Sequence, residues 1–289
     1  MRIQTLLFLM VSITDNTVLY TKTVLLFSHG IADTYKQAFP YAPSYKDNNI
    51  TYHNERFFFS CLFVTFDYPD ATQSFLRVNY NETSFGQENE INCLCTVYHN
   101  TVSRVLQTSH NCSLILFGSS RGASNLTIFA GLHDISYVKA MVLESPYYTM
   151  DNVIQNGMNQ LHLSWLPLSY GQSLAEFIFK KYSRCGMSPA KVLDSIPKDI
   201  PILIICSKED QRVPYASSIN MYKKLRLSGH EHTYILILDH GRHAKIICDV
   251  DGQKYQEVVH AFYKKYNLSY SSAHADSGEK YLMQCQPIL

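Results

Sequence analysis

The sequence lacks an excess of charge of either sign. Among its 289 residues, 25 Lys and Arg stand against 24 Asp and Glu, which gives a formal net charge of +1 at pH 7. With so small a net charge, the protein has no strong positive potential that would attract nucleic-acid phosphates or an anionic lipid surface. We therefore expect no nucleic-acid partner.

Glycine and proline are sparse as well, at 12 and 10 residues, and no repeat recurs at the periods typical of solenoids or propellers. These features exclude collagen-like, low-complexity and repeat architectures. Apolar residues make up 46% of the chain and charged residues 17%, a composition too hydrophobic for a disordered chain. The sequence predicts a single globular domain over residues 1–289, built around a large core.

The apolar run near the N-terminus, from Leu6 to Ile13, is far shorter than the ~20 residues of a membrane span. Although Arg2 precedes it, the run lacks the clear small-residue cleavage site of a signal peptide. It is interpreted as a strand that opens the fold, and a cytoplasmic location is expected. Secretion is the alternative, if the run is a cleaved signal peptide. The eight cysteines show no compact disulfide spacing, and those inside apolar runs are typical of small buried hydrophobes.

Six short apolar runs have the near-continuous hydrophobicity of strands buried on both faces of a parallel sheet. They span residues 23–28, 61–66, 112–118, 138–144, 201–207 and 233–239. Segments with helical periodicity lie between several of them. Strands that alternate with helices predict an α/β fold with an open, mostly parallel sheet and helices on both faces. The tail after Asn267 is polar and irregular, and we assign it no role.

One connection between strands, residues 147–200, is much longer than the dozen or so residues of an ordinary crossover. It carries its own helix-start signals: Ser173 and Glu176 form a capping box, and Ser188 precedes a proline at a first helical position. The segment is therefore predicted to be a small helical cap insertion. Its apolar stretch contains the chain's only tryptophan, Trp165, which we interpret as a substrate-binding residue.

The pentapeptide Gly118-Ser119-Ser120-Arg121-Gly122 stands directly after the third apolar run and before a helix-like segment. A G-x-S-x-G sequence between a strand and a helix is typical of a nucleophile elbow, in which the serine occupies a strained turn. The flanking glycines let the two backbones approach each other. Ser120 is thus the predicted nucleophile, and the backbone N–H of Arg121 is predicted to point into an oxyanion hole.

A serine hydroxyl needs a base to take its proton and an acid to orient that base. Asp210 follows the run 201–207, at the sheet edge where such sites assemble. We favour Asp210 as the acid. Its neighbour Glu209 and the strand-end residue Glu144 are the alternatives.

The loop after the last apolar run offers two histidines that could reach the serine across the carboxyl edge of the sheet. His243 is favoured as the base, because it follows a glycine-bearing loop and precedes the last helix. His240, which directly follows the strand, is the alternative. The second oxyanion donor is predicted after the first apolar run, where Gly30 permits a tight turn and Ile31 supplies its backbone N–H.

Taken in chain order, several short motifs carry a resemblance: FSHG, the strand end FDY, GSSRG, LESP, D-x-x-VP and the terminal histidine loop. They resemble the α/β-hydrolase superfamily of serine hydrolases, and within it the capped esterases, lipases and serine-aminopeptidase-like proteins. The resemblance covers residues 23–265 and implies the α/β-hydrolase fold. The chain departs from these relatives after FDY, where Pro69-Asp70-Ala71 replaces the usual glycine-containing loop.

The function predicted from these residues is that of a serine hydrolase, which cleaves a carboxylic ester, or an amide or thioester, through an acyl-enzyme. Ser120, His243 and Asp210 would form the catalytic triad, and the substrate would be a small molecule or an acyl or peptidyl compound. A non-catalytic binding or scaffold protein with the same fold is one alternative, and an acyltransferase that uses the same triad is another. The sequence leaves the substrate and the oligomeric state open.

No metal or organic cofactor is expected, because no phosphate-loop or dinucleotide-binding fingerprint occurs. A zinc site could be drawn from a group of residues with generic spacing near the C-terminal strand. These residues are His230, His232, Asp239, His240 and His243. We disfavour this alternative.

Overall fold

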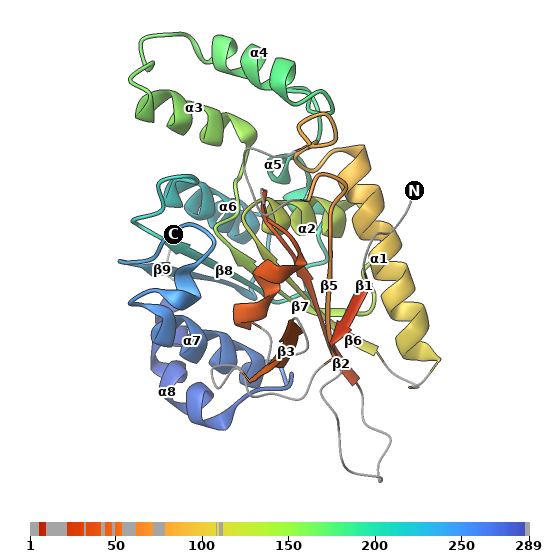
Figure 1. Cartoon of the computed structure of the whole chain (residues 1–289). Coiled ribbons are helices and arrows are strands. Elements are labelled where there is room, and N and C mark those ends of the chain that lie inside the picture. The colour runs from red at the N-terminus through yellow and green to blue at the C-terminus, as the bar shows by residue number, and fades with distance from the viewer. Residues whose placement is uncertain are drawn as a thin grey trace.

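The computed structural model describes residues 6–9, 22–31, 33–41, 44–47, 50–53, 62–71, 79–107, 109 and 112–286. Its centre is a seven-stranded sheet with the strand order β1-β5-β2-β6-β7-β8-β9 (Figure 1). The strands are β1 (Leu6–Leu9), β2 (Lys22–Ser28), β5 (Leu62–Phe66), β6 (Cys112–Ser119), β7 (Val138–Glu144), β8 (Ile202–Ser207) and β9 (Thr233–Leu238). Only β1 at the edge pairs antiparallel to its neighbour. A separate antiparallel pair consists of β3 (Ser44–Asp47) and β4 (Ile50–His53).

Helices cover both faces of the sheet, as the alternating pattern predicted. They are α1 (Glu88–Leu106), α2 (Arg121–Leu132), α3 (Met150–Gln160), α4 (Leu168–Ile178), α5 (Pro189–Val192), α6 (Tyr215–Leu227), α7 (Gly252–Lys265) and α8 (Ser272–Leu282). One core lies between the sheet and α1, α2 and α6, and the other lies between the sheet and α7 with α8. Along β2, Val24 and Leu26 face the first core, whereas Leu25 and Phe27 face the second.

The predicted strands agree with the observed ones to within a residue or two at each end, and the fold-class prediction is confirmed. The N-terminal run forms β1 over Leu6–Leu9, and its remainder lies outside the described residues. The tail contains an element that the sequence pattern did not indicate, the helix α8, which packs closely on α7. This packing depends on Gly278, where any β-carbon would overlap the carbonyl of Glu257. No helix among the described residues is long and apolar enough to cross a membrane.

The connection from β7 to β8 contains α3, α4, α5 and a short 3-10 turn (Leu193–Ser195). In Figure 1, α3 and α4 lie beyond the end of the sheet, apart from the helices that cover its faces. The two helices pack on each other, and Gly171 of α4 lies against Ile154 and Met158 of α3. Within the segment 147–200, α3 and α4 therefore stand apart from the two layers that cover the sheet, whereas α5 and the 3-10 turn pack on α2 and contribute to the core.

The turn between β6 and α2 depends on two glycines. A β-carbon on Gly118 would lie 2.7 Å from the backbone nitrogen of Ala123, and one on Gly122 would overlap the carbonyl of Ser28 on β2. Both neighbours are backbone atoms of packed elements, so they cannot move aside independently. The glycines therefore let α2 begin directly against the sheet.

We expect Gly122→Ala to lower the free energy of unfolding by about 1–3 kcal/mol, because strand and helix must separate to admit the methyl group. Gly157→Ala is the matched control: Gly157 lies inside α3, and no heavy atom approaches a β-carbon there within 4 Å. That control should raise the free energy of unfolding by about 0.5–1 kcal/mol, because alanine favours helix. Urea unfolding of both variants tests the expectation, and equal stabilities would contradict it.

Candidate active site

Loops that follow three parallel strands bring a serine, an acid and a histidine together. Ser120 follows β6, Asp210 follows β8, and His243 lies in the loop after β9. Because the carboxyl ends of parallel strands meet at one edge of a sheet, residues far apart in the chain converge there.

The three side chains form a continuous chain of short polar contacts. Nε2 of His243 lies 2.7 Å from Oγ of Ser120, and Nδ1 of His243 lies 2.7 Å from Oδ2 of Asp210. If Nδ1–H donates to the carboxylate, Nε2 is left as the acceptor for the serine hydroxyl. The Asp210 carboxylate is fixed in turn, since its Oδ1 accepts the backbone N–H groups of Arg212 and Val213 at 2.9 and 3.0 Å. This arrangement can remove a proton from Ser120 and stabilise the resulting imidazolium.

The backbone at Ser120 is strained, with φ of 55° and ψ of −121°. A non-glycine residue in such a conformation costs on the order of 1–3 kcal/mol, so the surrounding structure must hold it in place. The backbone N–H of Ser120 donates to the carbonyl of Glu144 at 2.7 Å, and its carbonyl accepts the N–H of Ser124. The turn is therefore fixed to β7 on one side and to α2 on the other.

The alternative acids have other partners. Glu209 contacts His240 at 3.0 Å in a pair that is more than half exposed, so these two alternatives bind each other rather than the serine. Glu144 is fully buried and accepts hydrogen bonds from the hydroxyls of Tyr41 and Tyr255 at 2.5 and 3.0 Å. Burial raises the pKa of Glu144. Of the predicted candidates, only Asp210 and His243 belong to the contact chain that ends at Ser120.

The predicted oxyanion loop lies beside the serine. A β-carbon on Gly30 would lie 3.4 Å from Cβ of Ser120. The N–H of Gly30 donates to Oε1 of Gln37 at 2.6 Å, which ties the loop to the turn that follows it. On the other side, Arg121 is the first residue of α2, and an N–H in the first turn of a helix has no partner within the helix. Both backbone groups predicted from the sequence thus belong to segments that adjoin Ser120.

The side chain of Arg121 was not predicted to have a role, yet it is almost fully buried between two acidic residues. Its Nη1 lies 2.5 Å from Oδ2 of Asp70 and 3.1 Å from Oε1 of Glu90. A charged residue in a strand-to-helix turn that packs against the sheet requires a buried counter-charge. The presence of an arginine at this position therefore indicated a buried acidic partner, although the sequence does not show which carboxylate it is. One of the two lies in Pro69-Asp70-Ala71, where the chain departs from its relatives.

The serine opens into a pocket of about 1320 Å³. Its walls come from the loop at Gly30 and Ile31 with the segment after it, and from the loops that carry Asp210 and His243. The lining residues are Gly30, Ile31, Asp33, Lys36, Gln37, Pro40, Tyr41, Ser120, Lys208, Glu209, Asp210, Gln211, Arg212, Arg242, His243, Ala244, Lys245, Ile247 and Cys248. Lysine and arginine outnumber acidic residues by five to three on this wall, but Lys208 and Arg242 form ion pairs with Asp239 and Asp249, which lie outside it.

Trp165 is not among these lining residues, and its side chain is 75% exposed. The structure therefore does not place Trp165 on the wall of this pocket, and its substrate-binding role stays a prediction. The apolar residues of the insertion that face the body belong to a different set. They form a small cluster with Ile31 and Val213, and include Tyr147, Met150, Val153, Ile154, Ala175, Phe179 and Tyr182.

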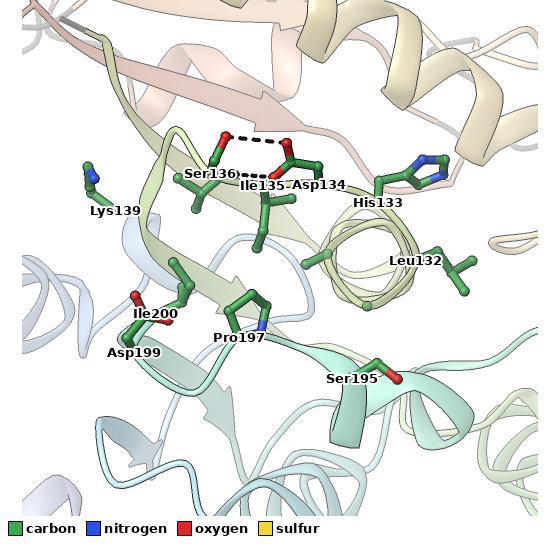
Figure 2. Close-up of a pocket in the computed structure, with 13 residues that line it drawn as sticks. Leu132, His133, Asp134, Ile135, Ser136, Lys139, Ser195, Pro197, Asp199 and Ile200 are labelled. Atoms are coloured by element: carbon green, nitrogen blue, oxygen red, sulfur yellow. Dashed lines mark hydrogen bonds between the residues drawn. The ribbon is translucent and has the colours of Figure 1, made fainter.

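Figure 2 shows residues that line a second pocket, of about 370 Å³. Because the lining includes the first residues of β7 and the residues just before β8, this pocket lies at the sheet edge opposite the serine. Ser136 and Asp134 hydrogen-bond to each other on its wall. No described residue there forms a serine–histidine–acid chain. Within the described part of the protein, no group of three or more His, Cys, Asp or Glu residues could hold a metal ion.

Known proteins share this fold. A structure of the acylaminoacyl peptidase of Pyrococcus horikoshii is similar with a TM-score of 0.61 and 14% identity, over 89% of this chain and 39% of that one. An esterase of Pyrococcus furiosus gives a TM-score of 0.58 and 16% identity, over 85% of this chain and 82% of that one. These similarities confirm the expected α/β-hydrolase fold.

The family model of the prolyl oligopeptidase family matches residues 107–268, more than half of the chain. The protein belongs to this family. An uncharacterised protein of Bacillus subtilis, YqkD, is 27% identical over 168 residues, which are 56% of this chain. The match spans 50% of that relative, so the chain covers about half the length of the curated protein it resembles.

His29 precedes the loop at Gly30 and Ile31 and is fully buried. The pH dependence of the free energy of unfolding therefore tests whether this histidine is buried as the structure shows. Burial, and then the charge of Arg121, lower the pKa of His29 from 6.5 to about 3. Between these two values the unfolded chain binds more protons than the folded one. The stability that neutral His29 contributes is therefore present in full above pH 6.5 and is lost as the pH falls toward 3.

We expect the free energy of unfolding of the natural protein to fall between pH 7.5 and pH 5 by about 2 kcal/mol more than that of His29→Gln. Glutamine can donate and accept hydrogen bonds but does not titrate in this range. Urea unfolding at the two pH values measures the difference. Parallel losses in both proteins would show that His29 is not held neutral by burial.

Proposed function

We propose that the protein is a serine hydrolase that cleaves a carboxylic ester through a covalent acyl-enzyme. The observation that carries the proposal is the contact chain from Ser120 through His243 to Asp210, with 2.7 Å at both steps. Membership of the prolyl oligopeptidase family and the similarity to an esterase and an acylaminoacyl peptidase support the same class of chemistry.

In this mechanism Oγ of Ser120 attacks the carbonyl carbon while Nε2 of His243 takes the hydroxyl proton. The imidazolium then returns that proton to the leaving alcohol as the acyl-enzyme forms. A water molecule attacks the acyl-enzyme by the same route, and the proton that His243 takes from water goes back to Ser120. Asp210 orients the imidazole and stabilises its charged form through both steps.

The negative charge that develops on the substrate oxygen would be stabilised by the backbone N–H groups of Ile31 and Arg121. The loss of one such donor typically lowers turnover about 10²- to 10³-fold. The strained turn at Ser120 fits this role, because it presents the hydroxyl at the sheet edge beside both donors.

We also propose that the insertion 147–200 serves as a cap that contributes to substrate selection. Side chains of α3 support this assignment, because Asn156 and Gln160 donate to backbone carbonyls of the loop that follows Asp210. The apolar cluster shared by the insertion, Ile31 and Val213 lies beside the pocket lined by Ile31 and would accept an apolar acyl portion.

Amide cleavage is the second candidate. An amide passes through the same acyl-enzyme, and both the family and the acylaminoacyl peptidase among the similar structures favour it. Hydrolysis of p-nitroanilides of acylated amino acids, measured beside p-nitrophenyl esters, distinguishes the two activities.

We expect a fluorophosphonate probe to label the protein at Ser120, as found by peptide mapping, and Ser120→Ala to abolish both labelling and hydrolysis of p-nitrophenyl esters. An activated serine is required for both reactions. Over an acyl series from acetate to octanoate, the KM should fall as the chain lengthens if the apolar cluster binds it. A well-folded protein that is neither labelled nor active would overturn the proposal in favour of a binding protein, and a KM that is constant along the series would overturn the assigned acyl site.

Two neighbouring carboxylates provide a matched pair of variants. Asp210→Asn should lower kcat about 10⁴-fold, because the amide favours the wrong histidine tautomer. Glu209→Gln removes the charge beside His240 but keeps an oxygen that can accept the backbone N–H of Gly241, so it should change kcat by less than about twofold. Ester hydrolysis by the two variants tests the assignment, and the opposite order of losses would assign the acid to Glu209.

A further inference from the structure

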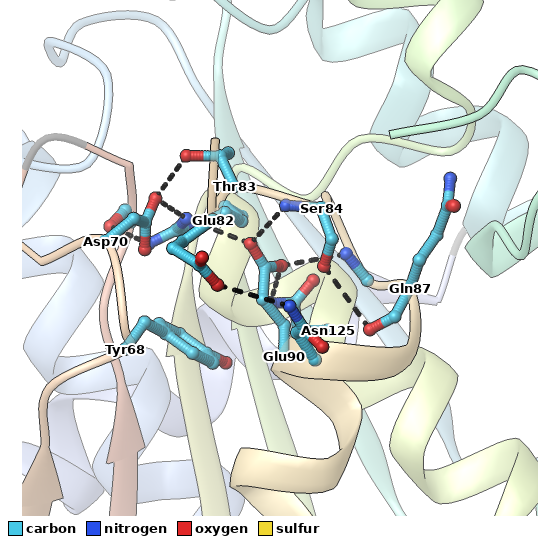
Figure 3. A network of polar contacts seen from close by, with 12 residues as sticks. Tyr68, Asp70, Glu82, Thr83, Ser84, Gln87, Glu90 and Asn125 are labelled. Atoms are coloured by element: carbon cyan, nitrogen blue, oxygen red, sulfur yellow. Dashed lines mark hydrogen bonds and ion pairs between the residues drawn. The ribbon is translucent and has the colours of Figure 1, made fainter. Parts of the chain in front are cut away.

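The side chain of Arg121 belongs to a buried polar network that joins three parts of the chain. Figure 3 shows other members of this network, among them Asp70, Thr83, Glu90 and Asn125. Asp70 comes from the loop after β5, Glu90 lies in the first turn of α1, and Gly30 belongs to the oxyanion loop. The side chains of Arg121, Asp70 and Glu90 are 1% exposed or less. The guanidinium also lies over the ring of Tyr68, 4.8 Å from its centroid.

Both carboxylates are themselves held in place. Asp70 accepts the hydroxyl of Thr83 at 2.6 Å. Glu90 accepts the backbone N–H groups of Ser84 and Gly86 at 2.9 and 2.8 Å, and the side-chain amide of Asn125 at 2.8 Å. The guanidinium is therefore clamped between groups that cannot rotate independently of the fold.

Stability alone does not explain such a network. Taking a guanidinium and two carboxylates out of water is costly, and well-packed apolar residues of similar volume are often equally stable or more so. What a clamped, planar guanidinium supplies is a hydrogen-bond donor at a fixed position and direction. Here the second terminal nitrogen, Nη2, donates to the carbonyl oxygen of Gly30 at 3.3 Å.

The carbonyl of Gly30 belongs to the same peptide unit as the N–H of Ile31. It accepts a second hydrogen bond, from Nδ1 of His29 at 2.7 Å, so two donors fix its direction. The described residues contain no cis peptide bond, and in a trans peptide the C=O and the N–H point in opposite directions. Fixing the carbonyl of Gly30 away from the pocket thus turns the N–H of Ile31 toward it, on the side where Ser120 lies.

We propose that the Arg121 side chain is a positioning residue for the oxyanion hole: by holding the Gly30 carbonyl, it aims the N–H of Ile31 at the substrate oxygen. The same residue supplies the other donor through its own backbone N–H. Arg121 thereby sets the geometry of both donors and couples them to α1 and to the loop after β5. This inference rests on the proposed serine hydrolase function.

The test uses Arg121→Lys. Lysine keeps a buried cation for Asp70 and Glu90, but its single ammonium cannot occupy the positions of both Nη1 and Nη2. With p-nitrophenyl butyrate, kcat should fall about 10- to 100-fold while KM changes less than about threefold, because a misaimed donor weakens binding of the transition state more than of the substrate. Arg226→Lys is the matched control: Arg226 lies near the end of α6, where its Nη1 donates to the backbone carbonyls of His230 and Glu231, and this variant should keep full activity.

A pair of inhibitors separates positioning from a general structural effect. A butyl trifluoromethyl ketone forms an oxyanion when Ser120 adds to it, whereas the corresponding alcohol does not. In Arg121→Lys the affinity for the ketone should fall by the same factor as kcat/KM, with the affinity for the alcohol unchanged. Equal losses for both compounds, or wild-type kinetics in a folded Arg121→Lys protein, would overturn the inference.

If Arg121→Lys does not fold, a triple variant takes its place in the kinetic and the inhibitor assays: Arg121→Met, Asp70→Asn, Glu90→Gln. The triple variant is expected to fold because it leaves no unpaired buried charge. The same losses are expected there, and wild-type kinetics would again overturn the inference. A natural protein without Ser120-dependent hydrolysis would instead overturn the proposed function, and the inference with it. If the natural protein is active and the Arg121 variant has unchanged kinetics, the inference is overturned and the proposed function stands.

Discussion

The close approach of β6, α2 and β2 at the serine turn is the constraint on which the site depends. Gly118 and Gly122 carry no side chain where the backbones meet, and Ser120 is held in a strained conformation between them. Because α2 starts directly against the sheet, the side chain of Arg121 enters the protein interior rather than solvent. The buried charge, its two carboxylate partners and the orientation of the Gly30 peptide all follow from that placement.

Patterns that depend on local burial could be predicted from the sequence. The strands of the sheet centre are apolar on both faces, so their runs stand out, and the residues at their carboxyl ends must share one edge of the sheet. That reasoning led to Ser120, Asp210 and His243 as candidates, and the structure places the three in contact. It favoured Asp210 over the neighbouring Glu209 but did not exclude Glu209, because a shift of one residue in a loop changes which way a side chain points.

Features that depend on distant partners could not be predicted. Arg121 is separated by 51 residues from Asp70 and by 31 from Glu90, and no local pattern links them. The helix α8 was not predicted, because the C-terminal segment that forms it is polar. Its position depends on the contact of Gly278 with α7, which no local pattern shows. The exposure of the Trp165 side chain could not be predicted either, because large apolar side chains can remain exposed.

The carboxylates that do not contact the serine–histidine pair still act on the histidine loop. Glu144 at the end of β7 accepts the N–H of Ile246 at 3.4 Å, on the C-terminal side of His243. Glu209 after β8 accepts the N–H of Gly241 at 3.3 Å, on the N-terminal side. The loop needs such anchors, because Gly241 and Ala244 adopt positive φ angles of 143° and 56°. Acids from two neighbouring strand ends thus contact one histidine loop, since Asp210 lies against the imidazole of His243 while Glu144 and Glu209 accept N–H groups of the backbone that carries it.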